Sequence, residues 1–331
     1  MNTDIGFAII GLGMGANRAK AVTETPGANL VCVCDLQEEK AKKLAQELDC
    51  EYYTDMKNVL ERDDVDVVGV MTPSGTHADV GIQAIEAGKH VFTTKPMDIK
   101  VEKCDAFMSA AEDAGVVLAV DFQCRYGENN RRLHKFLSED GLGKLILGDL
   151  RMKWYREQSY YDGGFPRGWK KDVQYEGGSA ANQGVHYIDL LHWFCGPVVE
   201  VYGRSGTLGH DIGTEDISLA MLTFENGAWG MIETTTCSYP SLGTRIEITG
   251  EEGTAIWDKS NEVTIEVKEN PDLGVEDIPI EAGPQNIVQD MLGAINEGKT
   301  VAVPGEEGKK SVRIFNAIYE SSRTGKTIRL D

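Results

Sequence analysis

Short, almost continuously apolar runs alternate with amphipathic segments over the first 122 residues of the chain. Such runs are typical of parallel strands that are buried on both faces of a sheet. The segments between them repeat apolar residues at helical spacing, as in Gln37–Leu48 and Glu102–Ala114. This alternation predicts a doubly wound α/β domain with a parallel sheet. We expect its strands at Ile5–Ile10, Leu30–Cys34, Val65–Val70, His90–Thr93 and Val116–Val120.

The pattern of apolar and polar residues changes after about residue 122. One helical segment, Gly178–Phe194, precedes a series of β-rich runs that turn-forming residues such as Glu225-Asn226-Gly227 separate. Runs and turns of this kind favour antiparallel hairpins. We expect the strands at Val198–Gly203, Ile217–Phe224, Ala228–Thr236, Arg245–Thr249, Thr254–Asp258 and Val263–Val267.

The end of the chain shows two further helical patterns, Gln285–Asn296 and Lys309–Ser322, and a short strand pattern, Thr327–Leu330. A chain of 331 residues is long for one hydrophobic core. The sequence therefore predicts two domains, 1–122 and 123–331, and the last helix is a candidate to pack back on the first of them. Because no linker is visible, we expect a ligand site in a cleft between the domains.

Composition and charge narrow the functional classes. With 53 acidic and 33 basic residues the net charge is −20, which disfavours nucleic acid and anionic membranes as partners. The apolar run at the N-terminus is too short for a membrane span and lacks the basic lead of a signal peptide. The seven cysteines form no C-x-x-C pair, so we expect reduced core thiols and a cytoplasmic protein.

A glycine-rich turn, Gly11-Leu12-Gly13-Met14-Gly15-Ala16, follows the first expected strand and opens a helix. Glycines allow a tight turn and let the backbone approach a pyrophosphate, to which the helix N-terminus offers free N–H groups. Glycines also merely turn chains, so the motif alone is weak. Asp35 strengthens it, because an acidic residue at the end of the second strand can accept hydrogen bonds from the adenosine ribose. No arginine or serine follows in Asp35-Leu36-Gln37, which favours NAD over NADP.

Two further strand ends carry polar residues. Thr72 and Pro73 follow one strand, and Thr94 and Lys95 follow the next. Ligands of open α/β sheets bind beyond the carboxyl ends of the strands, so these residues are placed for the nicotinamide half of the cofactor. A lysine desolvated beside nicotinamide suits proton exchange with an alcohol. The alternatives are that Thr76 or Ser74 merely caps a helix and that Lys95 is a solvated surface lysine.

In the second domain, Asn182 and His186 lie four residues apart and so project from one face of the expected helix. His186 can relay the proton of an alcohol, whereas Asn182 can only hydrogen-bond. Two other interpretations stay open: His186 and Asp189 as metal ligands, although the rest of a coordination set is missing, and a purely structural histidine. We predict no metal.

Together these motifs resemble the glucose–fructose oxidoreductase, inositol dehydrogenase and MocA (Gfo/Idh/MocA) family, from the glycine turn to the closing Ala317–Lys326 segment. The resemblance implies a Rossmann domain followed by an α/β domain with an open, largely antiparallel sheet, and a homodimer or homotetramer. It implies oxidation or reduction of sugars, inositols or nucleotide sugars. Lys95 and His186 match the catalytic lysine and histidine of the family. Cofactor contacts are implied for Gly11, Gly13, Met14, Gly15, Asp35, Leu36, Thr72, Pro73, His77, Thr94, Lys95 and Gln123.

Two positions depart from the family pattern. Thr94 replaces the usual glutamate, which loosens any expectation about how the nicotinamide ribose is held. Asn182 replaces the aspartate of inositol dehydrogenases, and its Asn-Gln-x-x-His pattern is similar to members that act on UDP-linked N-acetylhexosaminuronates and on glycosides. Candidate substrate contacts are Lys95, Arg125, Tyr126, Tyr161, Arg167, Trp169, Lys170, Asn182 and His186, because aromatic faces suit sugar rings and arginines suit anions.

The sequence thus predicts an NAD-dependent oxidoreductase that transfers a hydride between nicotinamide and a secondary alcohol of a sugar, glycoside, nucleotide sugar or inositol. One alternative is an enzyme that cleaves or epimerises glycosides and oxidises its substrate only transiently. Another is a non-catalytic NAD-binding regulator.

Overall fold

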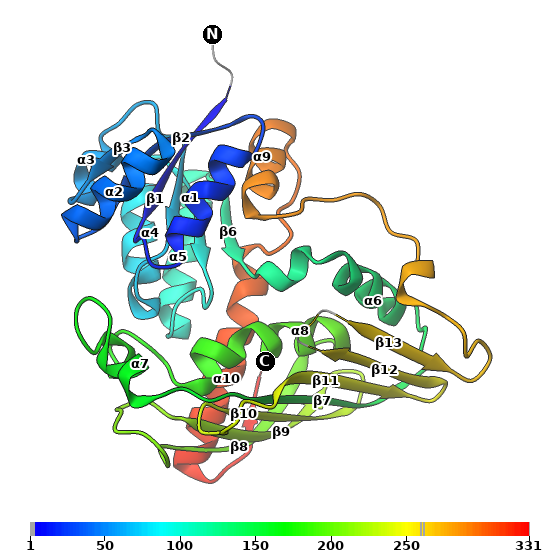
Figure 1. The fold of residues 1–331 in the computed structure, drawn as a ribbon. Helices are drawn as coiled ribbons and strands as arrows, with labels where there is room; N and C mark the ends of the chain where they lie inside the picture. The colour runs from blue at the N-terminus through cyan, green and yellow to red at the C-terminus, as the bar shows by residue number, and fades with distance from the viewer. Residues whose placement is uncertain (1–3, 259, 261, 331) are drawn as a thin grey trace. The chain divides into compact units, whose positions relative to one another are not determined.

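The computed structural model describes residues 4–258, 260 and 262–330, and these divide into two compact units (Figure 1). The first unit contains the chain up to Phe122 together with Pro284–Lys309, and the second contains Gln123–Gly283 and the chain from Lys310 onward. The second unit is therefore not the continuous segment 123–331 that the sequence led us to expect. Residues near Val303 group with the first unit because the Val303 carbonyl oxygen accepts a hydrogen bond of 2.9 Å from the N–H of Val120.

The first unit has a six-stranded parallel sheet in the order β3-β2-β1-β4-β5-β6. The order reverses between β1 and β4, so their carboxyl ends form the switch point where open α/β sheets bind ligands. The strands are β1 (Ile5–Ile10), β2 (Ala28–Cys34), β3 (Glu51–Tyr53), β4 (Val67–Val70), β5 (His90–Thr94) and β6 (Leu118–Asp121). The helices are α1 (Gly15–Glu24), α2 (Glu38–Leu48), α3 (Met56–Leu60), α4 (His77–Glu86), α5 (Val101–Ala114) and α9 (Ile287–Glu297). This confirms the expected doubly wound fold.

The second unit has an eight-stranded sheet in the order β13-β12-β11-β7-β10-β9-β8-β14, and among its described strand pairs only β7–β10 is parallel. Its strands are β7 (Leu145–Lys153), β8 (Val198–Gly206), β9 (Ile217–Phe224), β10 (Trp229–Thr235), β11 (Gly243–Gly250), β12 (Gly253–Asp258), β13 (Val263–Val267) and β14 (Ile328–Arg329). Its helices are α6 (Glu128–Ser138), α7 (Gln158–Asp162), α8 (Val185–Cys195) and most of α10 (Gly305–Thr324). The expected open, largely antiparallel sheet is confirmed.

The strand β7 is not among the expected strands, although it lies in the middle of the sheet. Its buried face consists of Gly148, Leu150 and Met152, and polar residues alternate with them. Gly148 is small because an added Cβ would lie 2.6 Å from the sulfur of Cys195. A glycine in place of an apolar residue interrupts the period-two pattern, which is why the sequence did not reveal this strand.

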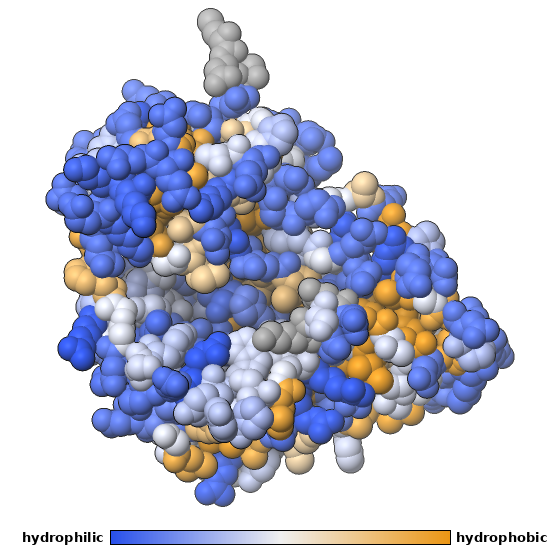
Figure 2. All heavy atoms as spheres, in the orientation of Figure 1, coloured by the Kyte–Doolittle hydropathy of each residue, from blue (hydrophilic) through white to orange (hydrophobic). Residues whose placement is uncertain are grey.

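One face of this sheet exposes apolar side chains, which we call the outer face. Cross-strand pairing joins Met221 to Tyr202 and Met231, and Trp229 to Leu147, so these residues form a continuous patch. Trp229 is 71% exposed and Met221 is 64% exposed. Figure 2 shows hydrophobic residues at the surface where β8, β9 and β10 lie, and a second group where β12 and β13 lie. Within the described part of the chain, no helix is both long and apolar enough to cross a membrane.

Candidate functional site

Four neighbouring strands of the first unit end in the residues that the sequence singled out. The glycine turn follows β1, Asp35 follows β2, Thr72 and Pro73 follow β4, and Lys95 follows β5. Because these strands are parallel and adjacent, all of these residues lie at the same edge of the sheet.

The three glycines of the turn have different surroundings, so glycine is present at each position for a different reason. Gly11 has a φ of +89°, and an added Cβ would lie 2.5 Å from the Met71 carbonyl oxygen, so the tight turn requires glycine. Gly15 packs α1 onto β1, since an added Cβ would lie 2.9 Å from Ile9. Gly13 is exposed, and its Cβ would meet nothing within 4 Å. Nothing in the fold of this turn therefore requires glycine at position 13, and space remains there for a ligand to approach the backbone.

Asp35 holds the glycine turn through its carboxylate, which accepts hydrogen bonds from the N–H of Leu12 at 2.8 Å and of Gln37 at 2.9 Å. Lys40 lies 3.0 Å from the same carboxylate. Burial alone would raise the pKa of Asp35, but these hydrogen bonds and Lys40 outweigh it and lower the pKa. The carboxylate is thus anionic at the place where the adenosine ribose is expected. Next to it, the Leu36 side chain is 73% exposed.

His77 lies inside the first unit, and not at its surface as a cofactor contact would. Its Nδ1 is 2.8 Å from the Pro96 carbonyl oxygen and its Nε2 is 2.8 Å from the Thr72 carbonyl oxygen. Burial lowers the pKa of His77 to about 4, so the ring is neutral and donates its single N–H to one of these carbonyls. We therefore correct the expectation for His77: its side chain joins the segments that carry Thr72 and Lys95, and it is not placed to touch the cofactor.

The segment at the end of β5 brings Lys95 close to other ionisable groups. Lys95 acts electrostatically on His77 and on Asp121, which ends β6. Asp121 is buried and forms an ion pair with Arg18 of α1, a pair that the sequence analysis missed. Burial raises the pKa of Asp121, and Arg18 and Lys95 partly offset this effect. Thr94 and Lys95 are both half-buried.

Thr72 and Pro73 are also half-buried. The hydroxyl of Thr76 lies 2.9 Å from that of Thr72 and 2.7 Å from the Pro73 carbonyl oxygen. Thr76 is the N-cap residue of α4, but its side chain makes no cap hydrogen bond to that helix. The Thr76 hydroxyl instead braces the Thr72–Pro73 segment.

In the second unit, the expected helix Gly178–Phe194 consists of two parts. Ser179–Gly184 forms a π-helical segment, η4, and α8 continues from it. Asn182 lies on η4 and His186 lies in the first turn of α8, and both are half-buried. The π-helical segment ends at Gly184, whose added Cβ would lie 2.7 Å from Thr234. Short π-helical segments occur frequently at functional sites.

Arg125 and Asp189 form a buried ion pair. The guanidinium donates from Nε and Nη2 to the two carboxylate oxygens at 2.8 and 2.7 Å, and the two side chains are 3% and 1% exposed. The Arg125 guanidinium also lies 4.8 Å from the centre of the Trp193 ring. Arg125 is therefore a structural residue and not the expected substrate contact, and Asp189 is occupied and not placed as a metal ligand. Tyr126 is 5% exposed and is likewise part of the interior.

Tyr161 is buried, and its hydroxyl lies 2.7 Å from that of Thr236, so the expected substrate contact at this position is wrong. The preceding residue, Tyr160, is the more informative one. Lys170 lies 4.1 Å from the centre of its ring and Arg156 lies 5.4 Å from it, and Gln183 of η4 donates to its hydroxyl at 3.1 Å.

Arg156 also lies 5.0 Å from the ring of Trp154, and Lys170 lies 5.7 Å from the ring of Trp169. We call Trp154, Arg156, Tyr160, Trp169 and Lys170 the Tyr160 cluster. Burial lowers the pKa of Lys170, and the charge of Arg156 adds to the effect, while Glu176 opposes it. Arg156 and Tyr160 were not among the expected substrate contacts, although Arg156 directly follows two aromatic residues, Trp154 and Tyr155.

The two remaining predicted residues lie at the surface of the second unit. Arg167 is exposed, and its Nε donates over 3.4 Å to the Asp162 carbonyl oxygen. Gln123 is exposed at the start of that unit.

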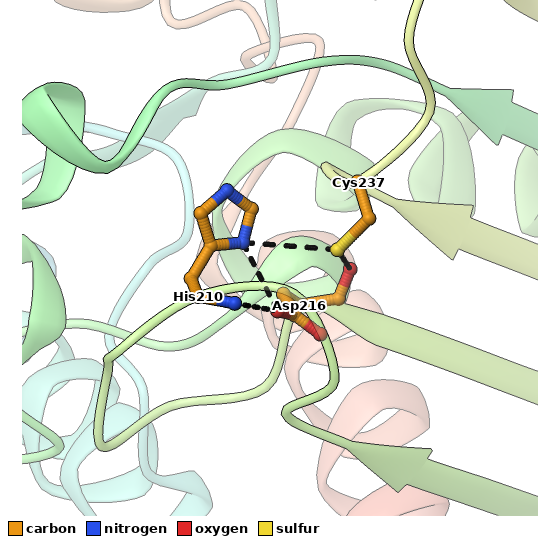
Figure 3. A group of neighbouring side chains, drawn as sticks. All are labelled: His210, Asp216 and Cys237. Carbon is orange, nitrogen blue, oxygen red and sulfur yellow. Dashed lines mark hydrogen bonds and ion pairs between the residues drawn. The ribbon is translucent and has the colours of Figure 1, made fainter.

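A second group of potential ligand atoms occurs where the β8–β9 loop meets the end of β10 (Figure 3). His210 Nδ1 lies 3.0 Å from Asp216 Oδ2 and 3.7 Å from Cys237 Sγ. The Asp216 carboxylate already accepts N–H donors from Leu208, Gly209 and His210. We therefore interpret His210, Asp216 and Cys237 as a structural cluster that stabilises the conformation of the β8–β9 loop.

A pocket of about 690 Å³ also lies in the second unit, where α6 and α8 end. Its walls include His134, Leu137, Trp193 and Phe194. The ring of His134 stacks on that of Trp193, with 4.1 Å between the ring centres. None of the residues that the sequence singled out for cofactor or substrate lines this pocket. We assign no role to it.

Comparisons with known proteins agree with this geometry. Residues 5–122 match the family model for oxidoreductases with an NAD-binding Rossmann fold, and residues 130–256 match the GFO/IDH/MocA C-terminal domain. The WlbA dehydrogenase of Bordetella pertussis, solved with NADH and UDP-GlcNAcA, is 27% identical, with a TM-score of 0.88 over 99% of this chain and 98% of that chain.

Two curated relatives represent different reactions. The scyllo-inositol 2-dehydrogenase (NAD(+)) of Bacillus subtilis is 26% identical over 100% of this chain and 98% of its own length. The 2,7-anhydro-N-acetylneuraminate hydratase of Mediterraneibacter gnavus is 28% identical over 69% of this chain and 61% of its own length. The first unit is thus an NAD-binding Rossmann domain, and the chain belongs to the Gfo/Idh/MocA family of oxidoreductases.

Proposed function

We propose that the protein is an NAD-dependent dehydrogenase that acts on a secondary alcohol of a sugar or sugar-like polyol. The observation that carries the proposal is the position of Lys95 at the end of β5, at the same sheet edge as the glycine turn. An amine placed there, beside the nicotinamide half of a dinucleotide, suits contact with the reacting oxygen of an alcohol.

The residues of the first unit fit a dinucleotide. Gly13 leaves room for a pyrophosphate, and the N-terminus of α1 supplies N–H donors and a partial positive charge. The exposed side chains of Met14 and Leu36 flank the turn, and a bound adenosine would cover them. Asp35 is held anionic, so it would accept from ribose hydroxyls and repel the 2′-phosphate of NADP. These features support NAD over NADP.

Bound NAD supplies the hydride acceptor for the alcohol carbon. In the proposed mechanism, Lys95 donates a hydrogen bond to the reacting oxygen and polarises it. His186 takes the proton of the alcohol during oxidation and returns it during reduction. Asn182, one turn before His186, orients the substrate by hydrogen bonding. General acid–base catalysis of this kind contributes roughly 10²–10⁴-fold to the rate.

The Tyr160 cluster supports an acidic sugar as the substrate class. In a chain with a net charge of −20, two cations lie beside three aromatic rings, and Gln183 links the cluster to η4. Aromatic faces pack against sugar rings, and cations pair with a carboxylate or phosphate. The similarity to WlbA, which was solved with UDP-GlcNAcA, supports the same class.

A screen of alcohols tests the function and the substrate class together. Matched pairs of neutral sugars and their uronates, as free sugars, glycosides and nucleotide sugars, are mixed with NAD or NADP, together with inositols. We expect the absorbance of reduced nicotinamide to appear at least tenfold faster with NAD than with NADP. We also expect uronates to be preferred over their neutral partners, since one charge-assisted contact is worth roughly 1.5–3 kcal/mol. Failure of every class to reduce NAD or to be converted would contradict the proposal.

The similarity to the 2,7-anhydro-N-acetylneuraminate hydratase supports a second candidate, in which the substrate is oxidised only transiently. In that case the screen yields product without net NADH. Product analysis by mass spectrometry in each well separates the two reactions.

We also propose that the protein is a homodimer or homotetramer that buries the outer face. Monomeric proteins rarely expose continuous apolar patches of more than a few hundred Å², and the outer face combines Tyr202, Leu219, Met221, Trp229 and Met231. A second copy of the chain offers the same face to it, as a two-fold interface requires.

A further inference from the structure

Glu215 is a buried carboxyl group that the proposed mechanism does not use. It lies directly before Asp216 and strand β9, and three donors reach its oxygens. The Ser179 hydroxyl donates to Oε2 at 2.6 Å, the Ala180 N–H donates to Oε1 at 2.7 Å, and the Tyr319 hydroxyl donates to Oε1 at 2.9 Å. The carboxyl group therefore joins the start of η4 to α10.

The backbone around Glu215 reinforces this attachment. The Ser179 N–H donates to the Glu215 carbonyl oxygen at 2.9 Å. An added Cβ on Gly178 would lie 2.1 Å from that oxygen and 2.4 Å from the side-chain carboxyl carbon. Only glycine permits so close an approach, which explains the second glycine of the Gly177-Gly178 pair.

The attached segment carries the candidate catalytic side chains. η4 begins at Ser179, contains Asn182 and runs without interruption into α8, which begins one residue before His186. The hydrogen bonds from Ser179 and Ala180 thus fix the first turn of the segment on which both side chains stand.

We propose that Glu215 is a positioning residue that holds η4 and thereby sets the positions of Asn182 and His186. This inference rests on the proposed function, because it assigns catalytic roles to that segment. A misplacement of about 1 Å in an active site can lower the rate on the order of 10²-fold, so a contact that fixes the segment has a measurable effect on turnover.

The charge of Glu215 changes within the working pH range of most enzymes. Burial raises the pKa of Glu215 to about 7, and the hydrogen bonds from Ser179, Ala180 and Tyr319 partly offset the effect. The two nearby tyrosines, Tyr319 and Tyr161, and the adjacent Asp216 keep their charge state near pH 7. Burial raises the pKa of Tyr319 and of Tyr161 well above the ordinary value, and the pKa of Asp216 is lowered by N–H donors despite burial.

The charge of Glu215 decides how firmly the segment is held. The ionised carboxylate accepts all three donors, and hydrogen bonds to an ionised acceptor are roughly twice as strong as neutral ones. A glutamine has the same shape and can keep three hydrogen bonds, because its NH₂ group can donate to the Ser179 hydroxyl, which in turn lies 3.2 Å from the Thr234 carbonyl oxygen. E215Q therefore imitates the protonated acid at every pH, whereas E215L leaves the donors unsatisfied.

The experiment measures kcat of the wild type, E215Q and E215L from pH 6 to pH 8.5. We expect E215Q to remain within about threefold of the wild type at pH 6, and the ratio of wild-type to E215Q kcat to rise by about threefold or more by pH 8.5, as Glu215 ionises. The ratio cancels any pH dependence that both proteins share. We expect E215L to lose about 10–100-fold in kcat with unchanged NADH affinity, because the NAD-binding unit is untouched.

The control variant is E225Q, which removes an exposed carboxylate in the β9–β10 turn and should leave every parameter unchanged. Amide hydrogen exchange of residues 179–184 gives a readout that does not depend on turnover, and we expect faster exchange in E215L than in the wild type. A pH-independent kcat ratio, or unchanged exchange in E215L, overturns the inference. If the wild type turns over no alcohol, the proposed function fails, and the exchange measurement still decides whether Glu215 holds η4.

Discussion

Replacement of Lys95 by alanine is expected to lower kcat for the alcohol substrate by about 10²–10⁴-fold, which is the usual contribution of a general acid–base group. The same loss is expected for His186→Ala, and the double variant should lose little more than either single one, because residues that act as a unit are not additive. NADH affinity should change less than threefold in both, since neither side chain is assigned to the pyrophosphate or the adenosine.

The control for these variants is Lys42→Ala, which removes an exposed lysine of α2 and should retain full activity. Steady-state kinetics and NADH fluorescence titration supply the two measurements. If Lys95→Ala turns over at a near-normal rate with cofactor bound, Lys95 does not perform the chemistry assigned to it.

Replacement of Gly13 by alanine is expected to weaken NADH binding on the order of 100-fold, which corresponds to about 2.8 kcal/mol. The added methyl group has room in the protein itself, since nothing lies within 4 Å of it. It would occupy the space through which a pyrophosphate approaches the turn. The melting temperature without cofactor should therefore match the wild type, while the stabilisation by NADH should be lost.

Two other glycines make this prediction specific. Gly11→Ala should destabilise the unit even without NADH, because its φ is +89° and Met71 leaves no room. Gly293→Ala on α9, where the nearest atom is a lysine side-chain carbon at 3.6 Å, should leave both stability and binding intact. Calorimetry of the three variants with and without NADH provides the comparison. Normal NADH affinity in Gly13→Ala would show that the ligand does not pass this glycine.

Much of the fold could be predicted because its signals are local. The strands β1 and β13 have the expected bounds, since each is a run of apolar or alternating residues that no other element interrupts. The strand β7 was missed because its inner face contains Gly148, which the sulfur of Cys195 requires to be small. The strand β3 was missed because it is short and largely exposed. Residues 284–309 return to the first unit through contacts far apart in the chain, which no local pattern reveals.

The sequence indicates which residues lie together at the sheet edge of the first unit more readily than it indicates the side-chain partners in the second unit. Strand ends and glycine spacing are local features, and a parallel sheet places them together without further information. Partners in the second unit are remote: Arg125 and Asp189 are 64 residues apart, and Tyr319 and Glu215 are 104 residues apart. An arginine therefore looks the same in sequence whether it binds a substrate or a buried carboxylate. Tyr160 and Tyr161 show the same difficulty, because neighbours in a helix face different surroundings.

The proposed mechanism requires Lys95 and His186, which belong to different units, to act on the same oxygen atom. The most direct measurement is a crystal structure of the protein with NADH bound. We predict that Lys95 Nζ and a ring nitrogen of His186 lie on the same side of the nicotinamide, within about 6 Å of each other, so that one oxygen lies within hydrogen-bond reach of both. A structure in which the two groups face away from each other, or in which the nicotinamide lies away from Lys95, would contradict it.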